Sequence, residues 1–380
     1  MKIAIVAGET SGDILAAGLI SALKKKYPQA EFMGIAGPLM QDQGMVSVAD
    51  MQKLSIMGLD GLLGSIGEIL SIRKNLLETL LADPPDIFIG VDAPDFNLTL
   101  EEKLRQQGIL TVHYVSPTVW AWRSYRIHKI RRAVDLMLTL FPFEADFYKQ
   151  HKVPVKFVGH PIAQSVKPHD CDPEFRERYA DQEQTLLAVL PGSRSSEIKR
   201  LGGLFLDVMR SLYQKDHSLR FIVPLVNERI HEQFEVFIQP EDHEFLYLVG
   251  GEQSRTAMSA ADIVLLASGT AALEAALLAK PTVVAYKLSW LTYWFAKATT
   301  AVKHASMPNH LLPEPIVPEF IQQQATVENL VAALQTYLKD AGLRTKTSQQ
   351  LATIHAKLDY DADQLAADAI VELLEKTPEL

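Results

Sequence analysis

The stretch KIAIVAGETSGD, residues 2–13, decides the fold class because it passes from a strand to a helix through a glycine-bounded turn. Residues 3–7 form a short apolar run rich in β-branched side chains, which is typical of a buried strand. Gly8 and Gly12 bound a polar loop, and a helical pattern follows. This βα unit predicts an α/β fold with a parallel sheet.

The same unit repeats to about residue 300, where short apolar runs alternate with helical patterns. We expect strands at residues 3–7, 31–35, 86–91, 109–115, 134–140 and 155–158, and again at 186–190, 219–224, 245–249, 262–266 and 281–285. The sequence therefore predicts two Rossmann-like domains that face a central cleft. They span residues 1–165 and 166–325, and residues 326–380 are predicted to form helices that pack on the first domain or on a partner subunit.

The composition narrows the class of protein. The chain has 380 residues, of which 48% are hydrophobic and 22% charged, as in a globular protein of about two domains. Its net charge of -9 has the wrong sign for a general nucleic-acid binder. The single cysteine, Cys171, forms no internal disulfide, and no Cys/His spacing indicates a zinc site. No apolar segment reaches the ~18 residues of a membrane-spanning helix. We expect a cytoplasmic protein with no metal, no cofactor and no nucleic-acid partner.

Carboxylates follow two of the predicted strands. Glu9 and Asp13 lie in the first loop, where Asp13 is equally well explained as a helix cap. Asp92 and Asp95 follow the strand at 86–91, and Asp95 is nearly as well explained as a cap. A sugar hydroxyl that attacks an anomeric carbon needs a general base. Glu9, Asp92 and Asp95 are therefore the candidate catalytic residues, with Asp92 first.

Residues 115–134 contain five lysines and arginines and no acidic residue. Arg123 and Arg126 can grip a phosphate, and the neighbouring Trp120 suits a sugar face or a bilayer interface. A solvated basic helix is the alternative.

A leucine-rich stripe occupies residues 54–81 at near-helical spacing. The pattern alone favours the core face of a helix. Glycines at positions 58, 61, 64 and 67 are poor helix formers, however, so an exposed membrane-docking patch competes with that interpretation. The residues concerned are Leu62, Leu63, Ile66, Ile69 and Leu70.

Two strand-to-helix turns in the second domain carry small polar residues. Gly192, Ser193 and Arg194 form the first, and this combination at a helix N-terminus suits a diphosphate. Ser268, Gly269 and Thr270 form the second, with Glu274 about one turn into the helix, where it can hold ribose hydroxyls. Capping explains most of each turn taken alone, but the pair favours a nucleotide-sugar.

Nine strings, in order, carry a resemblance to a known family: AGETSGD, GIAGPLM, DAPDFN, HYVSPTVWAWR, PFE, VGHP, LPGSRSSEI, SGTAALE and MPN. The chain resembles the lipid-A-disaccharide synthase family, whose members have a GT-B fold. The resemblance implies inverting transfer of 2,3-diacylglucosamine from UDP to 2,3-diacylglucosamine 1-phosphate (lipid X), which forms the β-1,6 disaccharide 1-phosphate and UDP. It implies no cofactor.

The resemblance also implies roles for residues. Asp92 matches the candidate base, and Ser193, Arg194, Thr270, Glu274 and Asn309 fall where UDP is expected. We place the acceptor near Asn97, Ser116, Trp120, Arg123 and Arg126, partly from charge. With this resemblance, contact with a membrane or with acyl chains becomes the favoured interpretation of the leucine stripe, in place of the core.

One loop departs from the family pattern. After Asn309 the family usually has a glycine and an arginine, whereas residues 310–314 read HLLPE, which puts a diphosphate contact there in doubt. Gln322 is still expected near the nucleotide. The resemblance further implies a peripheral protein on the cytoplasmic face of the inner membrane and a homodimer with exchanged C-terminal segments. An epimerase of the same fold and a non-catalytic nucleotide-sugar sensor remain alternatives.

Overall fold

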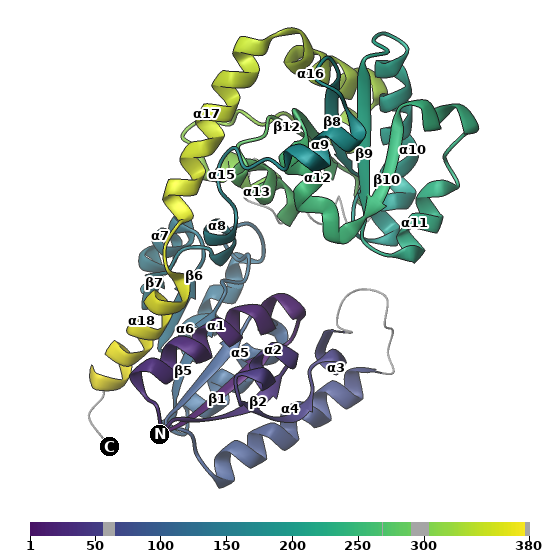
Figure 1. The fold of residues 1–380 in the computed structure, drawn as a ribbon. Coiled ribbons are helices and arrows are strands. Elements are labelled where there is room, and N and C mark those ends of the chain that lie inside the picture. Colours follow the sequence, from purple (N-terminus) through teal and green to yellow (C-terminus); the bar gives the residue numbers. More distant parts are fainter. Residues whose placement is uncertain (56–64, 268, 290–303, 377–380) are drawn as a thin grey trace. The chain divides into compact units, whose positions relative to one another are not determined.

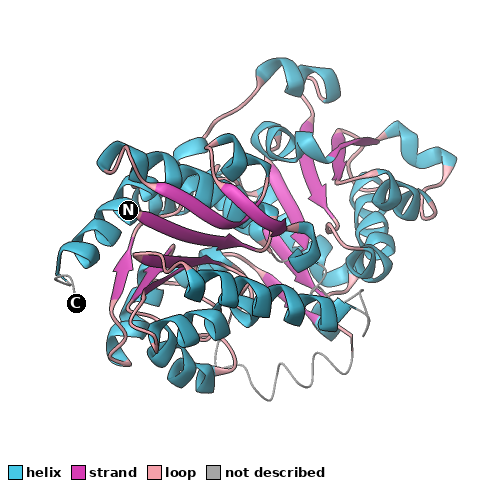
Figure 2. Ribbon diagram, turned by 90° about the horizontal axis from the view of Figure 1, so that it is seen from below, coloured by secondary structure: helices cyan, strands magenta, loops and turns pink. Residues whose placement is uncertain are grey.

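The computed structural model describes residues 1–55, 65–267, 269–289 and 304–376. The chain forms two compact units, Met1–Pro161 with Leu358–Leu380 and Ile162–Lys357. Each unit contains a parallel β-sheet with helices on its faces (Figures 1 and 2). The predicted α/β class, with two parallel-sheet domains and a helical C-terminus, is confirmed.

The sheet of the first unit has seven strands in the described part, in the order β3-β2-β1-β4-β5-β6-β7. They are β1 (Lys2–Ala7), β2 (Glu31–Ala36), β3 (Val46–Asp50), β4 (Ile87–Val91), β5 (Leu110–Tyr114), β6 (Leu136–Thr139) and β7 (Val155–Phe157). Every residue of β4 is buried, which explains its unbroken apolar sequence. The strand order reverses between β1 and β4, and ligands of such sheets bind at that switch point.

Helices cover both faces of this sheet (Figure 1). They are α1 (Thr10–Lys26), α2 (Pro38–Asp42), α3 (Gln52–Ser55), α4 (Ser65–Ala82), α5 (Pro94–Arg105), α6 (Ile127–Ala133), α7 (Pro142–Gln150) and α18 (Ala362–Lys376). The chain's last helix, α18, packs on its first, α1. A Cβ atom on Gly18 would lie 2.2 Å from a carboxylate oxygen of Asp363, so the glycine permits the close approach.

The sheet of the second unit has six strands in the described part, in the order β10-β9-β8-β11-β12-β13. They are β8 (Thr185–Leu190), β9 (Leu219–Leu225), β10 (Leu246–Gly250), β11 (Ile263–Ala267), β12 (Thr282–Tyr286) and β13 (Glu319–Ile321). All its pairings are parallel. Its switch point lies between β8 and β11.

The second unit has nine described α-helices. They are α8 (Pro161–Ser165), α9 (Pro173–Tyr179), α10 (Ser195–Tyr213), α11 (Glu228–Glu235), α12 (Ser254–Ala260), α13 (Thr270–Leu277), α15 (Met307–Leu311), α16 (Val327–Lys339) and α17 (Ala341–Leu358). Of these, α10, α11 and α16 pack against a continuous apolar core. Asp172, Asn227 and Thr326 cap the N-termini of α9, α11 and α16 with their side chains. None of the helices in the described ranges is long and apolar enough to span a bilayer.

Candidate active site

The turn after β4 holds Asp92 in an unusual backbone conformation. Asp92 and the following Ala93 both have left-handed geometry, with φ values of 53° and 41°. The Asp92 N–H donates to the Tyr114 carbonyl at 2.8 Å, which ties the turn to the end of β5. Left-handed residues other than glycine are sparsely populated and gather at functional sites. Asp92, which the sequence placed first as a base, thus lies in such a turn.

The first loop of the chain packs against this turn. A Cβ atom on Gly8 would lie 2.5 Å from the Cβ of Ala93, so only glycine fits without a shift. Glu9 comes next, is exposed and forms the N-cap of α1. Asp13 was predicted as a possible cap of its own helix, α1, but it caps a different helix. Its buried carboxylate accepts from the Leu39 and Met40 amides at 3.0 and 3.1 Å and so caps α2.

A cavity of about 440 Å³, here the Asp92 pocket, opens at the ends of β4 and β5. Its lining residues are Asp92, Pro94, Asp95, Val115, Ser116, Pro117, Thr118, Val119, Trp122, Arg123 and Arg126. Five predicted site residues therefore meet in one cavity: Asp92, Asp95, Ser116, Arg123 and Arg126. Val115 and Arg123 are also left-handed, with φ values of 79° and 54°. Strained backbone borders this pocket on several sides.

Two arginines, Arg123 and Arg126, line the Asp92 pocket together with two aspartates. Arg126 forms an ion pair with the exposed Asp95 carboxylate. Arg73, from α4, donates to the Asp95 carbonyl at 3.2 Å. The Arg123 guanidinium lies 4.1 Å from the centre of the Trp122 ring, a cation–π contact. This arrangement suits an anionic ligand, with one carboxylate already holding Arg126 in place.

Trp120 and Ser116 connect to a buried acid below the pocket. The Trp120 indole donates to Glu144 at 3.1 Å, and the Phe141 N–H donates to the same carboxyl group at 3.2 Å. The Ser116 hydroxyl lies 2.9 Å from the Tyr148 hydroxyl. Burial raises the pKa of Glu144 to about 8. The bond to Glu144 fixes the indole of Trp120, which is half-buried, and its predicted contact with the acceptor stays a prediction.

Asn97 lies in the interior of the first unit, whereas the sequence placed it near the acceptor. It is fully buried on α5, and its side-chain amide donates to the carbonyls of Asp92 at 2.8 Å and Val6 at 3.4 Å. A side chain with no exposed surface cannot contact an acceptor. Asn97 belongs instead to the support of the Asp92 turn.

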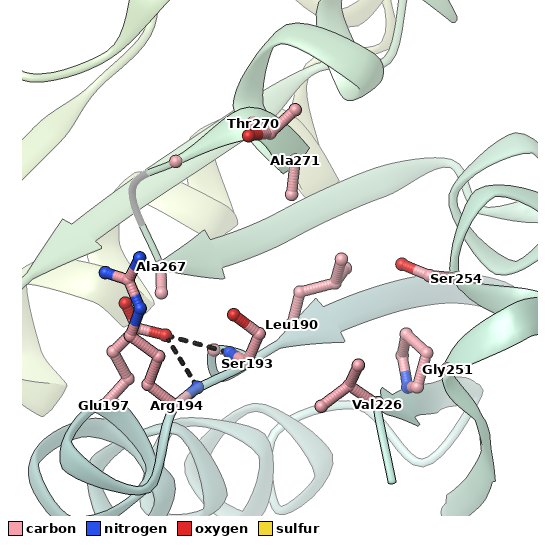
Figure 3. A pocket seen from close by; sticks show the side chains of 13 residues that line it. Leu190, Ser193, Arg194, Glu197, Val226, Gly251, Ser254, Ala267, Thr270 and Ala271 are labelled. Atoms are coloured by element: carbon pink, nitrogen blue, oxygen red, sulfur yellow. Dashed lines mark hydrogen bonds between the residues drawn. The ribbon is translucent and has the colours of Figure 1, made fainter. Parts of the chain in front are cut away.

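A second cavity, of about 320 Å³ and here called the β8 pocket, lies at the switch point of the other sheet. Figure 3 shows Ser193, Arg194 and Glu197 on one side and Thr270 with Ala271 on another. Gly192 and Gly269 also line it, in conformations with φ values of 126° and 152° that favour glycine. The two predicted small-residue turns therefore meet in one cavity.

The helix N-terminus in the β8 pocket already holds a carboxylate. Glu197 accepts from the amides of Ser193 at 2.8 Å and Arg194 at 3.2 Å (Figure 3). These two N–H groups are therefore engaged. The exposed side chains of Ser193 and Arg194 are the groups that can meet a ligand phosphate.

Three further residues predicted to bind UDP, Glu274, Asn309 and Gln322, do not line the β8 pocket. Glu274 is 3.6 Å from Arg255 in an ion pair, and burial raises the pKa of its carboxyl. The Asn309 amide makes four hydrogen bonds of 2.7–3.0 Å within residues 309–319, which use its full capacity. Gln322 bonds to both backbone groups of Leu288. Ser268 lies outside the described residues.

The leucine stripe divides between interior and surface. Ile69 is 5% exposed and belongs to the core, where it cannot meet a membrane as predicted. Leu70 is 48% exposed. Leu62 and Leu63 lie outside the described residues, as does the side chain of Ile66. Across the described ranges, no three His, Cys, Asp or Glu side chains gather in a way that could hold a metal ion.

Comparison with known proteins decides the family. Residues 3–371 match the family described as lipid-A-disaccharide synthetase. The chain is 46% identical over 377 residues to the lipid-A-disaccharide synthase of Pseudomonas fluorescens (strain Pf0-1), covering 99% of each chain. It is 48% identical over 379 residues to that of Aeromonas hydrophila subsp. hydrophila, covering 98% of each.

The chain belongs to the lipid-A-disaccharide synthase family. It is thus a glycosyltransferase of lipid A biosynthesis, as the resemblance implied.

Solved structures with a similar fold are more distant in sequence. UDP-GlcNAc 2-epimerase from Neisseria meningitidis, bound to UDP-GlcNAc, has a TM-score of 0.64 at 14% identity, covering 99% of this chain and 100% of that one. A glycosyltransferase from Rickettsia africae has a TM-score of 0.60 at 12% identity, covering 99% and 97%. These similarities confirm the GT-B fold of the synthase family in this chain and go no further.

Sequence reasoning missed several lining residues of both pockets. Pro224 lies near the end of β9, Val226 follows β9, and Gly251 and Ser254 follow β10; all four line the β8 pocket. The rule that ligands bind beyond the carboxyl ends of parallel strands could have found them. A Cβ atom on Gly251 would lie 2.4 Å from the Cα of Val226, which brings these two strand ends together. Thr118 and Trp122 of the Asp92 pocket lie within the quoted HYVSPTVWAWR string.

Proposed function

We propose that this synthase transfers 2,3-diacylglucosamine from UDP to the 6-hydroxyl of 2,3-diacylglucosamine 1-phosphate. The products are the β-1,6 disaccharide 1-phosphate and UDP, with inversion at the anomeric carbon. The observation that carries the proposal is the family match over residues 3–371, together with a pocket that holds Asp92 and two arginines.

Asp92 is the general base of the proposed reaction. Its carboxylate takes the proton of the acceptor 6-hydroxyl as that oxygen forms a bond to the anomeric carbon and the bond to UDP breaks. Its left-handed backbone and its place at the switch point support this role. Asp95 is paired with Arg126 and so is committed to an arginine, which leaves Asp92 as the carboxylate suited to accept a proton. Glu9, in the neighbouring loop, supplies negative charge beside it.

Arg123 and Arg126 hold the 1-phosphate of the acceptor in this proposal. Both line the Asp92 pocket, and guanidinium groups bind phosphate through paired hydrogen bonds. Ser116 lines the same pocket but is buried, and Trp120 is fixed by Glu144, so both shape the loop that presents the arginines. Asn97 supports the Asp92 turn from below.

The β8 pocket receives UDP in this proposal. Ser193, Arg194 and Thr270 offer two hydroxyls and a guanidinium to the diphosphate, while Gly192 and Gly269 let the backbone approach it. Glu274 acts beside the pocket through Arg255, while Asn309 and Gln322 hold nearby segments of their own unit together through their hydrogen bonds to Glu319 and Leu288.

Both proposed substrates carry acyl chains, which favours work at a membrane surface. We place the protein peripherally on the cytoplasmic face of the inner membrane, with the exposed Leu70 of α4 as one apolar contact. Sedimentation with phospholipid vesicles tests this placement. The homodimer with exchanged C-terminal segments rests on the family resemblance, and analytical ultracentrifugation tests it.

The test of the reaction is product analysis. The purified protein is incubated in detergent with UDP-2,3-diacylglucosamine and 2,3-diacylglucosamine 1-phosphate, and products are followed by mass spectrometry. We expect equal amounts of UDP and disaccharide 1-phosphate, formed only when both substrates are present. Turnover of an unacylated UDP-sugar without an acceptor would instead identify an epimerase. Binding of UDP without any product would identify a nucleotide-sugar sensor.

A further inference from the structure

Two polar residues occupy the buried face of α5. Asn97 and Glu101 are four residues apart, so they share one face of the helix, and both are fully buried. Gly90 of β4 lies beneath them. A Cβ atom there would be 2.1 Å from a carboxyl oxygen of Glu101 and 2.8 Å from the Cβ of Asn97. The strand therefore has a glycine where polar side chains of the helix need the space.

Asn97 and Glu101 form a column with His113. The column contacts β1, the turn after β4, and β5. His113 lies on β5 opposite Gly90, and its Nδ1 is 2.7 Å from Glu101 Oε1. Asn97, at the other end, donates to the carbonyls of Asp92 and Val6. Asn97, Glu101 and His113, here the polar column, thus run from the switch point between β1 and β4, which Asn97 contacts, to β5, which carries His113.

A gain in folding stability does not explain why these three polar residues are buried here. Asn97 Oδ1, Glu101 Oε2 and His113 Nε2 are buried and have no hydrogen-bond partner among the described residues. Burial raises the pKa of the Glu101 carboxyl, against the attraction of His113 and Lys129. Apolar residues of similar volume often stabilise a core at least as well as a buried ionisable pair. A functional reason is therefore needed.

The Asp92 turn supplies that reason. Asp92 and Ala93 keep a sparsely populated backbone conformation only if their surroundings hold them there. Two hydrogen bonds fix the Asp92 backbone. Its N–H donates to Tyr114, the neighbour of His113, and its carbonyl accepts from Asn97. The partner of Asp92 in one bond is a member of the polar column, and its partner in the other is the neighbour of a member.

We propose that Asn97, Glu101 and His113 are positioning residues that hold the Asp92 turn in its left-handed conformation and aim the Asp92 carboxylate into its pocket. They touch no substrate and act through Asp92. This inference rests on the proposed function, in which Asp92 is the base. Small displacements of a catalytic group have large effects on rate, so loosening the turn lowers kcat more than it weakens binding.

The test is a double-mutant cycle with Asp92. Glu101→Met keeps the side chain's length but removes its bond to His113, and we expect kcat to fall by about tenfold to a hundredfold. The KM of each substrate should stay within about twofold. Glu101→Gln keeps the hydrogen bond and should recover most of the lost rate. In an Asp92→Asn background, Glu101→Met should lower kcat by less than about twofold, because the base is already gone.

Glu102→Gln is the matched control. Glu102 is the next residue of α5 and pairs with Arg132 at the surface, so this variant should leave kcat unchanged. Asn97→Ser opens the other end of the column, and we expect it to couple to Asp92→Asn in the same way. If a thermal melt shows that Glu101→Met is unfolded, the cycle of Asn97→Ser with Asp92→Asn decides the question.

Equal fold-losses from Glu101→Met in the two backgrounds would overturn the inference, because the column would then act independently of Asp92. An Asp92→Asn variant with normal turnover is a different result. It would contradict the proposed function itself, so the two failures can be told apart.

Discussion

The side-chain amide of Asn97 donates a hydrogen bond of 2.8 Å to the backbone carbonyl of Asp92, five residues earlier in the chain. The bond joins the first turn of α5 to the left-handed residue that follows β4. Asn97, which the sequence placed near the acceptor, thus stabilises the turn that holds Asp92. Residues that approach or support this turn are therefore expected to affect rate.

Gly8→Ala tests the contact between the first loop and the Asp92 turn. The added methyl group would lie 2.5 Å from the Cβ of Ala93, so one loop must move. We expect a loss of about 1–3 kcal/mol in the free energy of unfolding, together with lower kcat. Urea unfolding and initial rates measure both. Gly67→Ala is the control, because nothing lies within 4 Å of its Cβ position on α4. Wild-type stability and rate in Gly8→Ala would contradict the contact.

Arg126→Ala tests the phosphate site. Loss of a charged hydrogen bond costs about 1.5–3 kcal/mol, so the KM of the acceptor should rise by about 10–100-fold, with the KM of the UDP-sugar unchanged. Steady-state kinetics with each substrate varied in turn measure this. Arg132→Ala removes an arginine that pairs with Glu102 at the surface, and it should change neither constant. An unchanged acceptor KM in Arg126→Ala would place the phosphate elsewhere.

Glu144→Gln tests the buried acid below the Asp92 pocket. Burial raises the pKa of Glu144 to about 8 in the folded protein, above its ordinary value of 4.5. Its contribution to stability is therefore fully present below about pH 4.5 and is lost as the pH rises to about 8. Glutamine does not titrate, so the stability of Glu144→Gln relative to wild type should increase across this window and level off above it. Urea unfolding from pH 5 to 9 measures the difference, and parallel curves would show that Glu144 ionises normally.

The fold was largely predictable because its signals are local. Twice in the chain, an apolar run is followed by a loop with glycine and then by a helical pattern. The two runs end at residues 7 and 190, and both loops lie at switch points. The strands β3 and β13 were missed. Both lie at sheet edges, and β3 alternates exposed and half-buried residues, so neither has the unbroken apolar run of a central strand.

The site was predictable at the level of loops, and less so at the level of side chains. Asp92, Arg126 and Arg194 line cavities because the ends of parallel strands meet at one edge. Asn97 and Asn309 look like ligand-binding amides in the sequence, yet both are buried and bonded to backbone. Asp13 caps a helix 26 residues away. The Asp13 bond depends on the folded arrangement and leaves no local pattern.

The most direct test of the central claim is the initial rate of disaccharide formation by Asp92→Asn at saturating substrates. Asparagine keeps the shape of the side chain but cannot take up the proton. We predict a fall in kcat of about 10²–10⁴-fold, with UDP affinity unchanged. Turnover within about twofold of wild type would contradict the assignment of Asp92 as the base of this glycosyltransferase.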